Sequence, residues 1–133
     1  MQISPYLSFD CTCAGAFRFY EGCLGGKITM MMTYADSPMA DSAAPEARDR
    51  IMHVRLTKDD TILVGSDSPI GRHQAMQGAY VSLMLSDADE AERIFAALSE
   101  GGAVHMPIAQ TFWARRFGIA ADRFGTAWMI HCE

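Results

Sequence analysis

With 133 residues, half of them apolar, the chain has the length of one domain and enough apolar side chains for a hydrophobic core. Its net charge of −5 argues against a nucleic-acid surface, which needs clustered lysine and arginine. No apolar run approaches the roughly 18 residues of a membrane span, and no signal peptide is visible. We therefore expect a cytoplasmic protein without a nucleic-acid or membrane partner.

The first half of the chain predicts a strand, a helix and three more strands. Apolar residues recur at helical spacing over residues 15–24, and Gly25-Gly26 ends that helix. Residues 36–49 are rich in Ser, Ala, Pro and charge, which predicts a mobile loop or lid. The predicted strands are 3–9, 27–35, 50–57 and 61–67, and the last two form a hairpin that turns at Lys58-Asp59-Asp60.

The same order then repeats. Asp87 and Glu90 resemble a capping box at the start of a helix over 87–100, and Gly101-Gly102 ends it. An aspartate that opens a tight turn and a glycine that closes it join the last two strands at residues 122–125. The predicted strands are 78–86, 103–110, 113–120 and 126–132.

This repetition predicts an internal duplication. A shift of 76 residues superimposes the two glycine pairs, and a shift of 75 superimposes the apolar residues of the two helices. We expect one domain over 1–133, with module one over 1–67, a linker over 68–77 and module two over 78–133. Each module is predicted to be βαβββ, so the fold class is α+β.

Short motifs along the whole chain add to this order of elements. They are Ser4-Pro5-Tyr6-Leu7, Phe19-Tyr20, Leu24-Gly25-Gly26, Ile51-Met52-His53, Gln110-Thr111-Phe112-Trp113-Ala114, Arg116-Phe117-Gly118, Asp122-Arg123-Phe124-Gly125 and Trp128-Met129-Ile130. Together they resemble the PhnB-like branch of the vicinal oxygen chelate superfamily, which includes glyoxalase I, extradiol dioxygenases and bleomycin- and fosfomycin-resistance proteins. Two positions depart from that branch: Arg123 stands where it usually has proline, and Ala114 where glycine is common.

The resemblance implies two modules whose curved mixed sheets surround a cavity, with helices on the outer faces. It also implies a homodimer and a small-molecule ligand. In the metal-dependent members, His, Glu or Gln on the first and fourth strands of each module bind a divalent ion. Matched to that pattern, the four positions hold Ser4 (or Pro5), Val64, Tyr80 and Met129, none of which is an ordinary ligand for such an ion. We therefore expect no metal and no other cofactor, while a rebuilt site from His53 and His131 stays open.

His53 is the candidate catalytic residue, because its strand neighbour on the predicted cavity face is Arg55 and a histidine titrates near neutral pH. A core histidine bonded across strands is the alternative. Trp113 is expected to form an aromatic wall for a ligand, or to pack its strand against a helix or a partner subunit. Arg115 and Arg116 are expected to point to opposite faces of one strand, so that one of them binds an anion. The predicted ligand-binding residues are Tyr6, Ser8, Arg55, Ser66, Tyr80, Ser82, Trp113, Arg115, Met129 and His131.

Three functional hypotheses follow. The first is a metal-free protein that binds a small polar or anionic metabolite or an antibiotic-like compound. The second is a lyase, isomerase or dioxygenase of the same superfamily, acting through His53 and an arginine or through a rebuilt metal site. The third is a structural or regulatory dimer whose cavity is vestigial.

Overall fold

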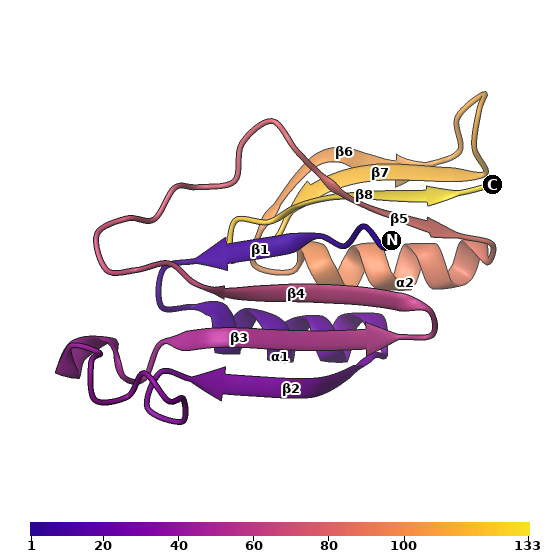
Figure 1. Cartoon of the computed structure of the whole chain (residues 1–133). Coiled ribbons are helices and arrows are strands. Elements are labelled where there is room, and N and C mark those ends of the chain that lie inside the picture. Colours follow the sequence, from indigo (N-terminus) through magenta and orange to yellow (C-terminus); the bar gives the residue numbers. More distant parts are fainter. The chain divides into compact units, whose positions relative to one another are not determined.

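The structure is a computed structural model that describes all 133 residues. It divides into two compact units, Met1–Ala75 and Met76–Glu133. Each unit consists of one helix and one four-stranded mixed sheet, in the order strand, helix, strand, strand, strand (Figure 1). The predicted α+β class and the two βαβββ modules are confirmed.

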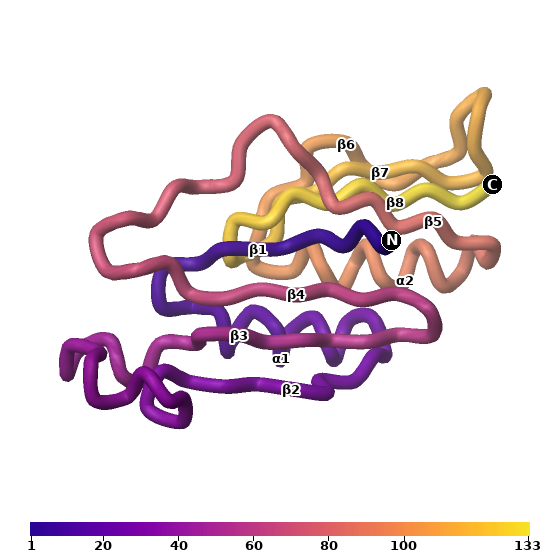
Figure 2. The backbone as a smooth tube through the Cα atoms, in the orientation of Figure 1, coloured from indigo at the N-terminus to yellow at the C-terminus, as the bar shows by residue number.

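In the first unit, the parallel neighbour of β1 is β4, and the remaining strand pairs are antiparallel, which gives the sheet order β1-β4-β3-β2. Between β2 and β3 the chain folds into turns and a short 3-10 helix, η1 (Figure 2). The elements are β1 (Tyr6–Phe9), α1 (Cys13–Leu24), β2 (Lys27–Thr33), η1 (Pro45–Ala47), β3 (Ile51–Lys58) and β4 (Thr61–Asp67).

Helix α1 buries its predicted apolar stripe against one face of this sheet. On α1 the buried residues are Cys13, Ala16, Phe17, Tyr20 and Cys23, and on the strands they include Leu7, Phe9, Val54, Leu56 and Leu63. The helix begins two residues before its predicted start at Gly15. The reason is a contact distant in sequence, because the backbone N–H of Cys13 donates to the carboxylate of Asp67 at 3.1 Å.

Strand β3 departs from simple alternation at its start. Strict alternation with Val54 and Leu56 would place Met52 beneath the helix, but Ile51 is the buried residue, at 3% exposure, and Met52 is only half-buried. An irregularity in the pairing of β2 with β3, between Met32 and Thr33, explains the difference. A residue without a cross-strand partner changes which side chain faces the core.

The second unit repeats the plan with the sheet order β5-β8-β7-β6. Its parallel pair is β5 with β8, and α2 buries its whole predicted stripe of Ala91, Ile94, Phe95 and Leu98. Side chains alternate strictly along β8: Trp128, Ile130 and Cys132 are buried at 1% exposure or less, and the residues between them are only half-buried. The elements are β5 (Val81–Leu85), α2 (Ala88–Ser99), β6 (Ala103–Ala109), β7 (Arg116–Ala121) and β8 (Ala127–Cys132).

The second glycine of each Gly-Gly pair is required by a close approach of backbone. A Cβ on Gly26 would lie 2.7 Å from the carbonyl oxygen of Thr57, and one on Gly102 would lie 2.1 Å from that of Ala121. Both distances are too short for any side chain. Each pair thus ends a helix and lets the next strand start directly beside its neighbour.

Neither helix of the chain is long and apolar enough to cross a membrane.

Candidate functional site

Each sheet has a second face that carries no helix of its own unit. On β3, Val54 and Leu56 point to α1, so His53 and Arg55 lie on the opposite face. We call this surface the helix-free face of the first sheet. From the strand alternation and register it includes Tyr6, Ser8, Met30, Met32, His53, Arg55, Val64 and Ser66. The structure thus brings together five of the predicted site residues: Tyr6, Ser8, His53, Arg55 and Ser66.

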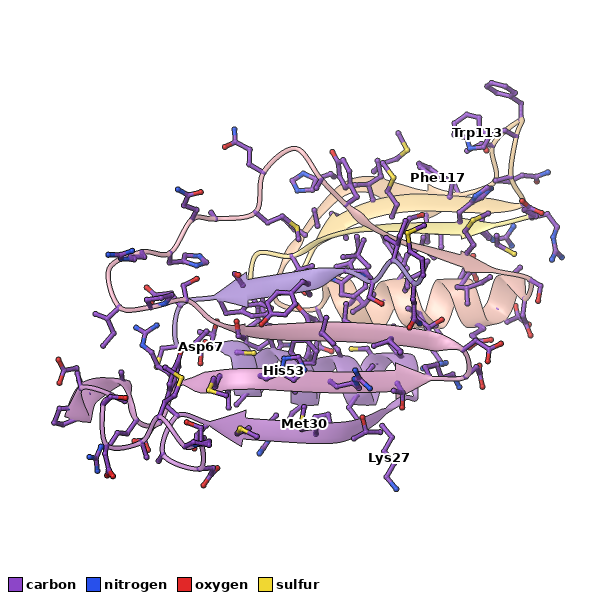
Figure 3. The ribbon with its side chains drawn as sticks, in the orientation of Figure 1. Lys27, Met30, His53, Asp67, Trp113 and Phe117 are labelled. Atoms are coloured by element: carbon purple, nitrogen blue, oxygen red, sulfur yellow. The ribbon has the colours of Figure 1, made fainter.

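Registers within the first sheet show which of these side chains are neighbours. Tyr6 pairs with Val64, Val64 with Arg55, and Arg55 with Met30, so these four form one row across the sheet. The ring of His53 lies beside that row, its centroid 6.2 Å from that of Tyr6 and tilted by 40°. Figure 3 marks His53 on β3 and Met30 on β2.

Arg55 is an exposed cation on this face. Its side chain is exposed and forms neither an ion pair nor a hydrogen bond with another side chain, whereas Arg50 and Arg116 both have carboxylate partners. The only bond at Arg55 outside the strand pairing is accepted by its backbone carbonyl, from the hydroxyl of Thr29 at 3.5 Å. The guanidinium therefore remains available to an anionic group from outside the chain.

The helix-free face of the second sheet is more apolar. Ser82 pairs with Met129, and Met129 with Ile119; in the next row Met84 pairs with His131, and His131 with Phe117. Tyr80 lies just before β5 and is 51% exposed.

His131 has an unusual environment on this face. Its Nε2 is buried and has no hydrogen-bond partner in the chain, while its ring stands 6.1 Å from that of Phe117. A buried polar atom without a partner costs free energy, so this nitrogen is a candidate to bond a water or a ligand atom.

We predicted that Trp113 starts a strand, but it lies outside one, because β7 begins only at Arg116. The residues just before β7 form a turn. In this turn the hydroxyl of Thr111 accepts hydrogen bonds from the N–H groups of Trp113 and Ala114, at 3.4 and 3.1 Å. Such hydroxyl bonds to nearby backbone compete with strand pairing. Trp113 is half exposed, with its ring centroid 5.5 Å from that of Phe117, and both are labelled in Figure 3.

The two adjacent arginines are both engaged within the second unit. Arg115 lies outside the strand, and its guanidinium donates to the carbonyl oxygens of Ser86 and Glu133. Arg116 extends to the helix side and forms an ion pair with Glu92 on α2 at 2.9 Å. The prediction that both arginines lie on one strand was therefore wrong, because β7 begins at Arg116. Both guanidinium groups bond to groups of their own unit.

The four positions that correspond to metal ligands in the resembling family do not fit a divalent ion. Val64 offers no donor atom, Met129 offers a thioether, and Tyr80 a phenol hydroxyl. Beside Val64, Pro5 uses its carbonyl oxygen to accept the N–H of Val64 at 3.2 Å. Within neither unit do three His, Cys, Asp or Glu side chains gather as a metal-binding group.

Sequence reasoning missed Asp67, the most deeply embedded carboxylate of the first unit. At 4% exposure it accepts the N–H of Cys13 at 3.1 Å and that of Ile51 at 2.8 Å. Burial, followed by the charge of Asp67, raises the pKa of the Cys13 thiol to about 12. The only signal was an aspartate at the end of an apolar strand, which by itself does not identify its partners.

Comparisons with known proteins agree with this architecture. A family model described as the Glyoxalase/Bleomycin resistance protein/Dioxygenase superfamily matches residues 2–130. Protein YjdN of Escherichia coli (strain K12) is 30% identical over 141 residues, which cover 98% of this chain and 95% of YjdN.

Two solved structures are similar over the full length. Protein PA1353 from Pseudomonas aeruginosa is 42% identical with a TM-score of 0.92, covering 100% of this chain and 98% of its own. A PhnB protein from Bacillus cereus is 19% identical with a TM-score of 0.82, covering both chains completely, so its fold agrees with the predicted branch. The chain therefore belongs to the glyoxalase/bleomycin resistance protein/dioxygenase superfamily.

Proposed function

We propose that the chain binds a small polar or anionic molecule, without a metal ion, on the helix-free face of its first sheet. The observation that carries this proposal is the exposed guanidinium of Arg55, which has no ion pair within the chain. Tyr6 and His53 stand beside it, and the hydroxyls of Ser8 and Ser66 follow on β1 and β4. An arginine fork with neighbouring hydroxyls suits a carboxylate or a phosphate.

In this proposal each side chain has a separate task. Arg55 binds the anionic group, the hydroxyls orient the rest of the molecule, and the Tyr6 ring covers an apolar part. The ring nitrogens of His53 donate or accept hydrogen bonds, which also makes it the residue to test for catalysis.

The test uses malonate, a small dianion, and malonamide, its neutral counterpart, on chelator-treated protein labelled with ¹⁵N. We expect malonate, but not malonamide, to shift the amide resonances of Tyr6, His53 and Arg55. Arg55→Gln should weaken malonate binding roughly tenfold, the usual worth of a hydrogen bond to a charged group.

Arg18→Gln is the matched control, because Arg18 lies on α1, on the other side of the same sheet, where it reaches the sulfur of Met31 at 3.7 Å. It removes the same charge and should leave malonate binding unchanged. Equal weakening in both variants, or no shift with malonate, would contradict the proposal. His53→Ala should reduce binding more than it reduces stability.

The proposal extends to a cytoplasmic homodimer. All four cysteines are free thiols, and one of them, Cys11, is exposed, which suits a reducing compartment. Both sheets end in strands with one unpaired edge, and on β6 the apolar residues Val104 and Met106 are 49% and 41% exposed. Light scattering at micromolar concentration should give the mass of two chains, and a mass of one chain would contradict the dimer.

A further inference from the structure

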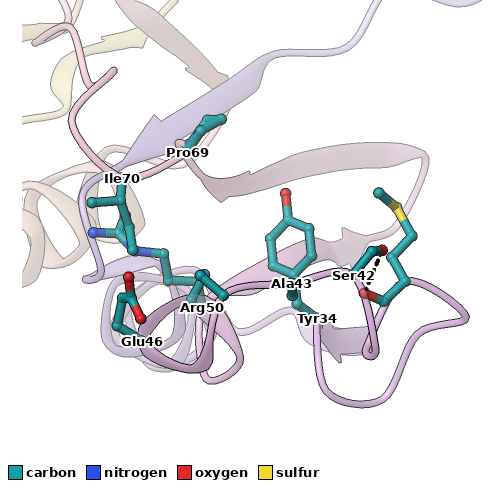
Figure 4. Close-up of a pocket in the computed structure, with 10 residues that line it drawn as sticks. Tyr34, Ser42, Ala43, Glu46, Arg50, Pro69 and Ile70 are labelled. Carbon is teal, nitrogen blue, oxygen red and sulfur yellow. Dashed lines mark hydrogen bonds between the residues drawn. The ribbon is translucent and has the colours of Figure 1, made fainter.

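A pocket of about 320 Å³ lies in the first unit, between the segment that links β2 to β3 and the residues just after β4 (Figure 4). None of its lining residues belongs to the helix-free face of the first sheet, so it is separate from the site proposed above. Its volume falls at the lower end of the range of small-molecule sites. The lining residues are Tyr34, Met39, Ser42, Ala43, Ala44, Glu46, Ala47, Arg50, Pro69 and Ile70.

The wall of this pocket is built by hydrogen-bonded turns. The hydroxyl of Ser37 donates to the carbonyl of Tyr34 at 2.8 Å and accepts the N–H of Met39 at 3.1 Å. Ser42 in turn donates to the carbonyl of Met39 at 3.1 Å, the bond drawn in Figure 4. Further on, the N–H of Ala35 bonds the carbonyl of Arg48 and closes the segment at its base. The segment predicted as a loop or lid therefore has an internal framework that can hold a shaped pocket.

The positive charge at this pocket, the guanidinium of Arg50, already forms an ion pair with Asp10. Arg50 is buried, and its guanidinium donates to the carboxylate of Asp10 at 2.9 Å and to the carbonyl of Ser68 at 2.8 Å. The hydrogen bond with Asp10 raises the pKa of Arg50 above its ordinary value, so the group stays charged and paired. It has little capacity left for an anionic ligand.

The negative charge at this pocket, the carboxylate of Glu46, has no ion-pair partner within the chain. Glu46 on η1 is exposed at the same pocket, and its carboxylate forms neither an ion pair nor a hydrogen bond within the chain. Most of the other lining side chains are apolar, among them Met39, Ala43 and Ile70. The net charge of −5 also favours the approach of cations.

We infer that this pocket binds a small organic cation, an apolar body that carries one ammonium group. The body would lie among Met39, Ala43 and Ile70, with the ammonium group at Glu46. Tyr34, labelled in Figure 4, is a further lining residue and adds an aromatic ring to the pocket. This chemistry is opposite in sign to that of the site around Arg55.

The test compares three probes of one shape: 2-phenylethylamine, the neutral 2-phenylethanol and the anionic phenylacetate. We expect the amine to bind most tightly in NMR titrations of the full chain, with shifts at Tyr34, Ala43 and Ile70. Glu46→Gln should weaken amine binding roughly two- to fivefold, as expected for an exposed ion pair, and leave the alcohol unaffected.

Two further variants complete the design. Asp60→Asn removes one carboxylate from the turn between β3 and β4, in the same unit, and should leave all three probes unchanged. Ala43→Leu should weaken the amine and the alcohol together, because it fills the pocket. Phenylacetate binding as tightly as the amine, Glu46→Gln behaving like Asp60→Asn, or amide shifts confined to other parts of the chain would each overturn the inference.

Discussion

The two units each bury one aspartate to the same extent, 4% exposed, but use it over very different distances along the chain. In the first unit, Asp67 accepts N–H groups from Cys13 and Ile51, which lie 54 and 16 residues away. In the second unit, Asp122 accepts groups two, four and six residues ahead, the last of them the indole N–H of Trp128 at 2.8 Å. One carboxylate joins three distant segments, and the other shapes a single turn.

The helix starts repeat this contrast. Asp87 caps α2 locally, since its carboxylate accepts the N–H groups of Asp89 and Glu90 at 2.9 and 3.3 Å. Thr12 stands at the same place before α1 but makes no side-chain cap. Instead, Asp67 at the end of β4 accepts the N–H of Cys13, the first residue of α1; Asp67 is labelled in Figure 3. Free N–H groups at a helix start need an acceptor, which either a neighbour in sequence or a neighbour in space can supply.

The largest expected loss of stability follows from removing the indole ring of Trp128, whose N–H donates to Asp122. Trp128 is 1% exposed within the core of the second unit. Trp128→Ala should lower the free energy of unfolding by roughly 3–5 kcal/mol through loss of burial and the cavity left behind. Denaturant titration measures this change, with Trp128→Phe as the control that keeps an aromatic ring but loses the bond to Asp122. A loss below 1 kcal/mol for the alanine variant, on the order of an exposed site, would show that the ring is not part of the core.

Removing the two helix caps tests the contrast between long-range and local aspartates. Asp67→Ala leaves the N–H groups of Cys13 and Ile51 buried without an acceptor, so we expect a loss of roughly 2–4 kcal/mol. Asp87→Ala exposes its donors to water at the surface and should cost about 1 kcal/mol. The same denaturant titrations compare them, and equal losses would mean that burial does not distinguish the two caps.

The smallest expected effect on stability comes from the thiol of Cys13, next to Asp67. The pKa of Cys13 is raised from 9.0 to about 12, so the folded state keeps this proton where the unfolded state has lost it. The contribution of this group to stability is therefore complete below pH 9 and declines as the pH rises towards 12. Unfolding of wild type and Cys13→Ala at several pH values checks this: the variant should lose less stability between pH 8 and pH 10. Identical pH profiles would contradict the shift.

Thiol labelling provides an independent measurement of the same environment. At pH 8 the exposed Cys11 should react with a thiol reagent, while Cys13, which is fully buried, should react only on unfolding. Asp67→Asn weakens the hydrogen bonds that the N–H groups of Cys13 and Ile51 donate to this side chain, so it should increase unfolding and speed the labelling of Cys13 relative to wild type.

Much of the molecule follows from local sequence. The left-handed Gly25 at the end of α1, the turn at Asp122 and the cap at Asp87 all depend on residues within a few positions of each other. Alternation along β8 correctly separated Trp128 and its buried neighbours from Met129. The same local patterns, taken in order, indicated two βαβββ modules and the superfamily.

Other features were decided only by tertiary structure. The start of α1, the burial of Ile51 in place of Met52, and the turn that takes Trp113 off its strand each depend on competing partners that the local pattern does not show. The pocket beside Glu46 likewise needs the turns after β2 and the residues after β4 to meet. Patterns of period two or 3.6 determine which face of a strand or helix is apolar. Partners distant in sequence determine where each element begins and which polar groups remain unpaired, because those contacts form only when the chain is folded.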